Sequence, residues 1–244
     1  LGWLRSDAFK SKAKLVYEYE TFCNQSAYLY PAMAEFYRSV GTQIATQWTY
    51  GLSAYVEYLG GSHVFNLKTT PRKAASFMVA KQQFKDVPTT YSYESRSSAV
   101  LHEGHLIYSG WSYNNDWSLS VLGKEKKSPF SLTGVGNSPF VNYEGSGLYF
   151  IELSEQGGLR LSIMPNVEFI RPHWKELHTG EPVVKFDSTN AHRFELTMPN
   201  FAGICWIYRK EGWRWELIES VNGYISFEAR PGEYLIEKTP IRIK

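Results

Sequence analysis

The chain of 244 residues is long enough for one large domain or two modest ones, and its 43% hydrophobic and 20% charged residues argue against a disordered chain. The formal net charge is +2, and acids and bases are mixed along the chain. This balance argues against a nucleic-acid-binding protein, because such proteins usually concentrate basic side chains in one stripe.

Short sequence signals exclude further classes. No apolar stretch approaches the roughly 18 residues of a membrane span, so we expect none. The start, "LGWLRSDAFK", lacks both an initiator methionine and the apolar core of a signal peptide, so we expect a mature form or a fragment. Cys23 and Cys205 are far apart and can form neither a disulfide framework nor a four-ligand zinc site, which predicts two unpaired thiols.

Strand-like and helix-like runs alternate in the first third of the chain. The expected elements are a strand at 14–20, a helix at 31–40, a strand at 42–50 and a helix at 71–84. Pro31 suits a first helical position, Gly41 suits a C-terminal cap, and Thr70 suits an N-terminal cap. Such alternation predicts parallel β/α units.

The segment 51–70 is long for a loop between a strand and the following helix, and loops of this length in compact domains are usually functional. In a (β/α)8 barrel, every strand-to-helix loop lies on the face that carries the active site. His63 lies in this segment and is a candidate for substrate contact, although a loop histidine is more often structural or solvated.

From about residue 91 the pattern indicates antiparallel strands. Hairpin turns are expected at Glu103-Gly104, Gly157-Gly158, Glu211-Gly212 and Pro231-Gly232. Regular hairpins of this kind predict a β-sandwich. The expected fold class is therefore α/β plus all-β, with strand-helix units in residues 1–88 and an antiparallel β-sandwich in residues 89–244.

Two carboxylates end the first expected strand. Because side chains alternate along a strand, Val16, Glu18 and Glu20 are expected to share one face. Hydrolysis of glycosides by two carboxylates needs such a residue as nucleophile or as acid/base. The alternative is an ordinary solvated or salt-bridged glutamate at a strand end.

Trp48 lies near the end of the following strand, where an indole beside a carboxylate can form the floor of a sugar subsite. Gln47 and Tyr50 are possible hydrogen-bonding partners for substrate in the same place. The alternative for Trp48 is a core side chain. No second histidine lies at metal-ligand spacing from His63, so neither a catalytic metal nor another cofactor is expected.

The segments "LVYEYE", "YLYPAMAEFYRSVGTQIATQWTY" and "NLKTTPRKAASFMVAKQQF" resemble the last units of (β/α)8 retaining glycoside hydrolases from glycan-degrading bacteria. In that clan the nucleophile ends strand seven and strand eight offers an aromatic side chain. The later "SPFVNYEGSGLYFIELSEQGGLRLSIMPN" resembles the β-sandwich that follows such barrels. The resemblance implies a carbohydrate substrate and a periplasmic or extracellular location.

Carried onto this chain, the resemblance implies Glu18 as the nucleophile, Glu20 as the second choice and Trp48 as the subsite aromatic. Only about two β/α units are present where a barrel requires eight. The resemblance therefore implies a fragment of a glycoside hydrolase, with the acid/base residue upstream of this chain.

Two other hypotheses remain. In a non-catalytic carbohydrate-binding or adhesive protein, one sandwich face would expose the indoles of Trp111, Trp117 and Trp174. Alternatively, residues 129–244 are a structural support, and four alternating aromatic residues belong to the sandwich core or to inter-domain packing, namely Trp206, Tyr208, Trp213 and Trp215. The sequence does not indicate the sugar, the linkage or the oligomeric state.

Overall fold

The computed structural model describes residues 2–21, 29–52, 54–58, 65–86, 97–102, 105–111, 117–122, 129–138, 140–154, 157–170, 181–198, 201 and 203–241. Its helices are η1 (Gly2–Arg5), α1 (Asp7–Lys10), α2 (Leu29–Ser39), η2 (Val56–Tyr58) and α3 (Pro71–Asp86). The strands of the amino-terminal part are β1 (Leu15–Tyr19) and β2 (Ile44–Gln47).

The remaining strands follow α3. The first of them are β3 (Ser97–His102), β4 (His105–Trp111), β5 (Trp117–Leu122), β6 (Pro129–Val135), β7 (Val141–Tyr143), β8 (Tyr149–Leu153) and β9 (Leu159–Ile163). The others are β10 (Asn166–Phe169), β11 (Val184–Asp187), β12 (His192–Leu196), β13 (Ile204–Glu211), β14 (Arg214–Asn222), β15 (Ile225–Ala229) and β16 (Gly232–Glu237).

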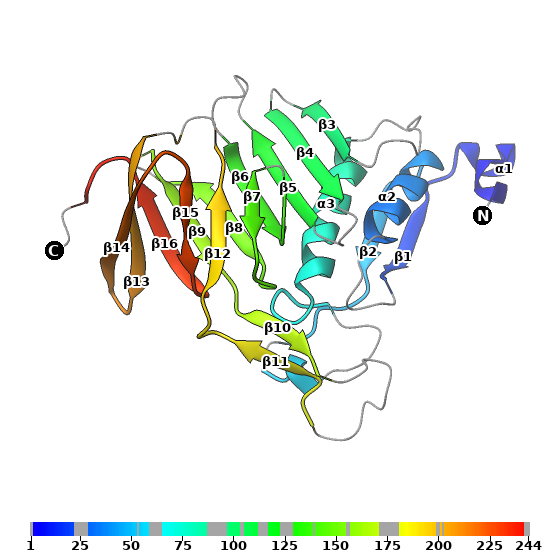
Figure 1. The fold of residues 1–244 in the computed structure, drawn as a ribbon. Coiled ribbons are helices and arrows are strands. Elements are labelled where there is room, and N and C mark those ends of the chain that lie inside the picture. The colour runs from blue at the N-terminus through cyan, green and yellow to red at the C-terminus, as the bar shows by residue number, and fades with distance from the viewer. Residues whose placement is uncertain are drawn as a thin grey trace.

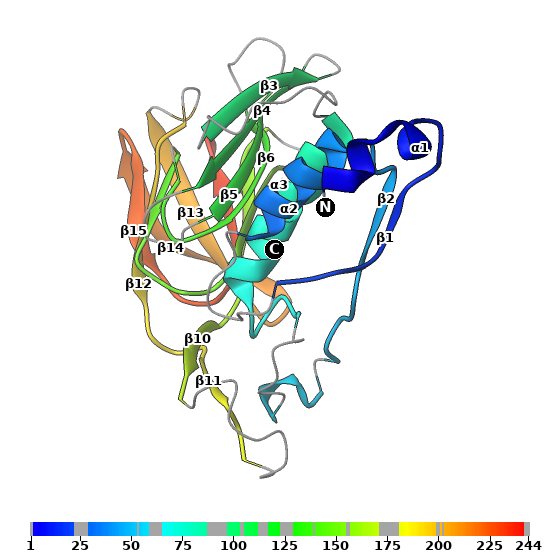
Figure 2. The ribbon, with the colours of Figure 1, turned by 90° about the vertical axis from the view of Figure 1, so that its right-hand side faces the viewer.

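The elements form layers. A nine-stranded sheet in the order β14-β13-β16-β9-β8-β6-β5-β4-β3 faces a three-stranded sheet in the order β15-β12-β7 (Figure 1). Helices α2 and α3 pack on the other side of the large sheet, and the pair β1-β2 lies beyond the helices (Figure 2). The two-stranded ribbon β10-β11 extends from the sandwich (Figure 1).

The predicted fold class is wrong. The described residues form mostly strands in antiparallel sheets, with only short helices, so the fold is mainly all-β. These residues contain no (β/α)8 barrel units. Parallel pairing among these residues is confined to β1 and β2, which α2 connects. The strand-helix alternation stops at α3, because the next strand, β3, pairs antiparallel with β4 at the edge of the large sheet.

The hydrophobic core between the helices and the large sheet includes residues from both sides of position 88. Tyr30, Ala74 and Val79 of the helices pack there with Val135 and Leu148 of the later segment. The division of the chain at residue 88 stays a prediction.

Local turn signals were mostly correct. Gly41 has a φ of +80° just after α2, as a C-terminal cap requires. The antiparallel pairs β3-β4, β8-β9 and β13-β14 confirm the strand pairing of three of the four predicted hairpins, although Glu103 and Gly104 themselves lie outside the described residues.

The fourth predicted hairpin, at Pro231-Gly232, is wrong. Strand β15 pairs with β12 in the small sheet, whereas β16 pairs with β13 and β9 in the large sheet. Buried side chains of both strands, including Phe227 and Tyr234, meet across the core. Two strands that face each other across a core cannot also be neighbours in one sheet, so the chain crosses between the sheets here.

The loop after β11 depends on one carboxylate. Oδ1 of Asp187 accepts hydrogen bonds from the Thr189 N–H (2.8 Å), the Thr189 hydroxyl (2.9 Å) and the Asn190 N–H (3.0 Å). The bonds from the Asn190 and Thr189 backbone N–H groups hold the pKa of Asp187 well below its usual range.

This lowered pKa predicts a pH-dependent contribution of Asp187 to stability. The contribution is present above the unfolded pKa of about 3.9 and is lost as the pH falls through the lower folded value. We therefore expect Asp187→Ala to lower the urea unfolding midpoint at pH 7, by a difference that shrinks between about pH 4 and pH 2. Asp7→Ala, which removes an exposed carboxylate, is the control and is expected to change little. A difference for Asp187→Ala that is constant with pH would contradict this role.

Candidate functional site

The candidate site lies where β1 and β2 end, because parallel neighbouring strands bring their carboxyl ends to one edge. The register pairs Val16 with Ala45 and then Tyr19 with Gln47. Two residues of β1, Tyr17 and Glu18, therefore lie opposite one residue of β2, which is a β-bulge. The hydroxyl of Thr46 lies within hydrogen-bonding reach of the carbonyl oxygens of Val16 and Tyr17 at this point and can donate its one proton to either.

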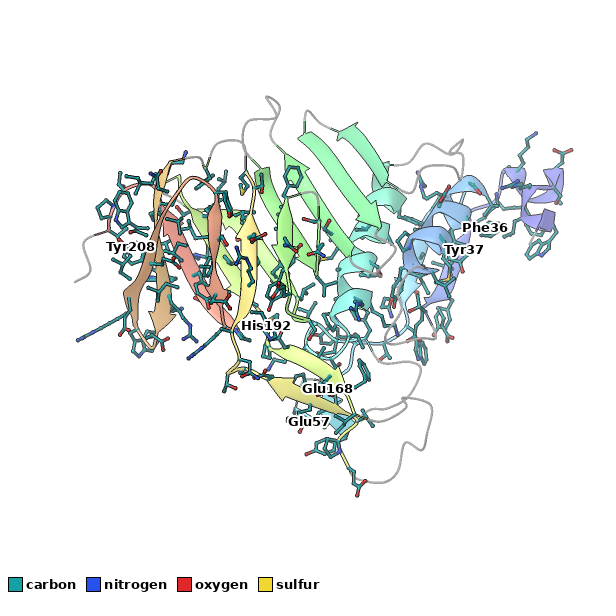
Figure 3. All side chains as sticks on the ribbon, viewed as in Figure 1. Phe36, Tyr37, Glu57, Glu168, His192 and Tyr208 are labelled. Carbon is teal, nitrogen blue, oxygen red and sulfur yellow. The ribbon has the colours of Figure 1, made fainter. Side chains whose placement is uncertain are left out.

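The bulge overturns the predicted alternation along β1. Val16 and Tyr19 both pack against the helices, whereas Tyr17 and Glu18 are exposed. The hydroxyl of Tyr19 donates a hydrogen bond of 2.5 Å to the carbonyl of Tyr30 in α2. Its ring also contacts the rings of Tyr30 and Tyr37, and Figure 3 shows Tyr37 on α2. Tyr19 thus anchors the end of β1 to α2, and this burial raises its pKa.

Glu20, one residue past β1, has a different environment from Glu18. Its side chain is only 9% exposed, and its Oε1 lies 3.5 Å from Nζ of Lys73, whose side chain is fully buried in the first turn of α3. The structure therefore brings Glu20, and not Glu18, into an ion pair inside the protein.

Other polar groups are buried around this ion pair. The hydroxyls of Thr21 and Tyr30 and the amide of Gln47 have no well-formed hydrogen bond to any residue that the structure describes. Burial raises the pKa of Tyr30, the charge of Glu20 raises it further, and the nearby side chain of Gln47 lowers it. We call Glu20, Thr21, Tyr30, Gln47 and Lys73 the strand-end cluster.

Three aromatic side chains in β1 or just after β2 are exposed. Trp48 is 46% exposed and Tyr50 is 50% exposed, so the alternative of a core Trp48 is wrong. Tyr17, on the bulge of β1, is also exposed. We call Tyr17, Trp48 and Tyr50 the aromatic rim. The strand-end cluster offers hydrogen-bonding groups and the exposed rings offer flat apolar surfaces, and a polyhydroxylated ring requires both.

The predicted site residues therefore lie in three different environments. Glu20 and Gln47 belong to the strand-end cluster, Trp48 and Tyr50 belong to the aromatic rim, and Glu18 is exposed on the bulge. His63 lies outside the described residues. The catalytic and substrate-binding roles of all six residues stay predictions.

Sequence reasoning missed Lys73 and Tyr30. Lys73, Ser76 and Ala80 follow helical spacing and all three are buried, but a lysine and a serine do not mark a buried face in the sequence. Lys81, on the same helix, is exposed.

The described part of the chain contains neither a cluster of metal-ligating side chains nor a helix that could span a membrane. No three metal-ligating side chains gather there, and the prediction of no metal or cofactor stays a prediction. Within the same residues, no helix has the length and apolar character that crossing a membrane requires.

No protein-family model, no curated protein and no solved structure matches this chain.

Proposed function

We propose that the carboxyl ends of β1 and β2 bind a carbohydrate, and that this chain contributes the nucleophile of a retaining glycoside hydrolase. The observation that carries the proposal is a nearly buried carboxylate, Glu20, in a polar cluster just after β1, together with the exposed indole of Trp48 just after the parallel neighbour β2. Polar groups of the cluster would bond to sugar hydroxyls, and the aromatic rim would stack on the apolar faces of the rings.

Glu20 is our choice for the nucleophile, and Glu18 remains the alternative. The resemblance favours Glu18, but its side chain is exposed on the bulge. A nucleophile must be held in a fixed position, and among these two glutamates only Glu20 has an ion pair with a buried partner.

The proposed reaction has two steps. A carboxylate oxygen of Glu20 attacks the anomeric carbon while the glycosidic C–O bond breaks, and an acid protonates the leaving oxygen. In the second step the residue that acted as the acid takes a proton from a water molecule. The oxygen of that water attacks the anomeric carbon and releases the carboxylate of Glu20. The second carboxyl group would lie roughly 5 to 5.5 Å from the first. A periplasmic or extracellular location, where polymeric glycans occur, fits this proposal.

The test uses a panel of 2-deoxy-2-fluoroglycosyl fluorides in the gluco, galacto, manno and xylo series, added to the protein that carries this chain. Fluoride leaves without protonation, so a retaining nucleophile forms a stable ester whose position mass spectrometry identifies. We expect an ester on Glu20, loss of labelling by about a thousandfold or more in Glu20→Gln, and normal labelling in the control Glu18→Gln. An ester on Glu18 would reverse the assignment, and no ester on either residue would refute a nucleophile here.

A second candidate function is non-catalytic carbohydrate binding by the sandwich. It is favoured by Trp213, which is 100% exposed at the β13-β14 turn, and by the exposed Leu217 and Ile218 further along the edge strand β14. The prediction that Trp213 belongs to a core is wrong, whereas Tyr208 is buried (Figure 3). The side chains of Trp111, Trp117 and Trp174, on which the earlier form of this hypothesis depended, lie outside the described part.

Binding to a glycan array separates the two candidates. If the strand-end site binds glycans, Trp48→Ala should weaken binding by about tenfold or more, and Trp213→Ala should leave it unchanged. The opposite result would favour binding by the sandwich.

A further inference from the structure

Lys73 occupies a position that is unfavourable for a cation. Its side chain is fully buried, and taking an ammonium group out of water costs several kcal/mol in general. It is also the third residue of α3, where the positive end of the helix dipole repels a cation. The intrinsic preferences of α3 therefore do not account for a lysine here.

The carboxylate of Glu20 lies against Lys73, with its Oε1 3.5 Å from Nζ. Glu20 lies at the end of β1, and Lys73 lies 53 positions later at the start of α3. The ion pair therefore joins the strand end to a helix that also packs against the large sheet. Apolar residues can often replace a buried ion pair without loss of stability, so stability alone is a weak reason for this one.

We propose that Lys73 is a positioning residue that holds the Glu20 carboxylate at the strand end for attack on the sugar. This inference rests on the function proposed above. In it, Lys73 contacts neither the sugar nor the leaving group. It fixes the direction of the Glu20 carboxylate, because its ammonium group lies 3.5 Å from Oε1 and is itself fully buried.

The consequence is a specific split between two kinetic constants. In labelling by a 2-deoxy-2-fluoroglycosyl fluoride, a Glu20 oxygen forms a bond to the anomeric carbon, the C–F bond breaks, and fluoride leaves with the electron pair. Lys73 acts only on the attacking carboxylate. Its loss should therefore lower the rate constant of ester formation and leave the dissociation constant of the reagent unchanged.

The experiment compares Lys73→Met, which removes the charge at similar length, with Lys73→Arg, which keeps it. The matched control is Lys81→Met, on the same helix but exposed. For Lys73→Met we expect ester formation at Glu20 to be about 10- to 100-fold slower, with a reagent dissociation constant within about twofold of wild type. Lys73→Arg should recover most of the rate, and Lys81→Met should match wild type. Lys73→Gln, neutral but polar, gives the same measurement if Lys73→Met does not fold.

Each outcome bears on a different statement. If wild type forms the ester on Glu20 and the folded Lys73 variants form it equally fast, the role of Lys73 is refuted and the nucleophile remains. A weaker dissociation constant with an unchanged rate constant would also refute it, because Lys73 would then shape the binding site. If wild type forms no ester on Glu20 with any reagent, the proposed function itself fails.

Discussion

Replacement of Asn166 by alanine is expected to lower the free energy of unfolding by about 3 kcal/mol or more. Asn166 is 6% exposed at the start of β10. Its Oδ1 accepts hydrogen bonds from the N–H of Ser146 (2.8 Å), the N–H of Gly147 (3.1 Å) and the hydroxyl of Tyr143 (3.2 Å). Alanine would leave all three donors without this acceptor, and each buried donor without a partner costs about 1–3 kcal/mol.

The matched control is Asn142→Ala. Asn142 is exposed, and its amide donates one hydrogen bond to Glu195 at 3.0 Å. This substitution should change the free energy of unfolding by about 0.5 kcal/mol or less. Urea unfolding of both variants at pH 7 measures the difference, and a loss below about 1 kcal/mol for Asn166→Ala would contradict the role of Asn166.

The second large effect is expected in the sandwich core. Phe194, in β12, is 0% exposed and lies between the two sheets. Its ring centroid is 5.4 Å from that of Tyr143, 5.8 Å from that of Tyr149 and 5.9 Å from that of Phe227. Phe194→Ala removes these contacts and leaves a cavity among rigid rings, so we expect a loss of about 3–5 kcal/mol in the free energy of unfolding.

Trp213→Ala is the control for Phe194→Ala, because it removes a larger ring that is 100% exposed. Its expected effect is within about 0.5 kcal/mol. Thermal and urea unfolding of both variants check the contrast. Equal losses for the two variants would show that the ring of Phe194 is not in the core between the sheets.

Individual elements were predictable where the physical cause is local. Pro31 and Gly41 indicated a helix that the structure places at Leu29–Ser39, and the helix predicted from position 71 begins there. The turn residues of three hairpins also indicated the correct pairing. Each of these signals acts through the φ and ψ angles of a few adjacent residues, so they can be read from the sequence.

Membership of a sheet was not predictable in this way. The alternation of strand and helix in the first third is real, but it indicated a barrel, whereas the structure has one parallel pair beside a large antiparallel sheet. The segment after α3 decides between the two, because a strand at 97–102 can pair either with β2 or with a later strand. It pairs with β4.

The candidate site shows the same division. A carboxylate at the end of β1 and an indole after β2 were predicted from the sequence, but the choice between Glu18 and Glu20 depends on the bulge. That bulge exists because β1 has one residue more than β2 over the same length, which neither strand shows alone. The partner of Glu20, Lys73, is 53 residues away along the chain.

The sequence by itself indicated two helices, the pairing of three hairpins, and which acids and aromatic residues lie near strand ends, because those features depend on neighbouring residues. The tertiary structure alone decided which strands pair, which glutamate is buried and that a lysine lies against it. These depend on contacts between distant segments, whose energies are set only when a common core forms.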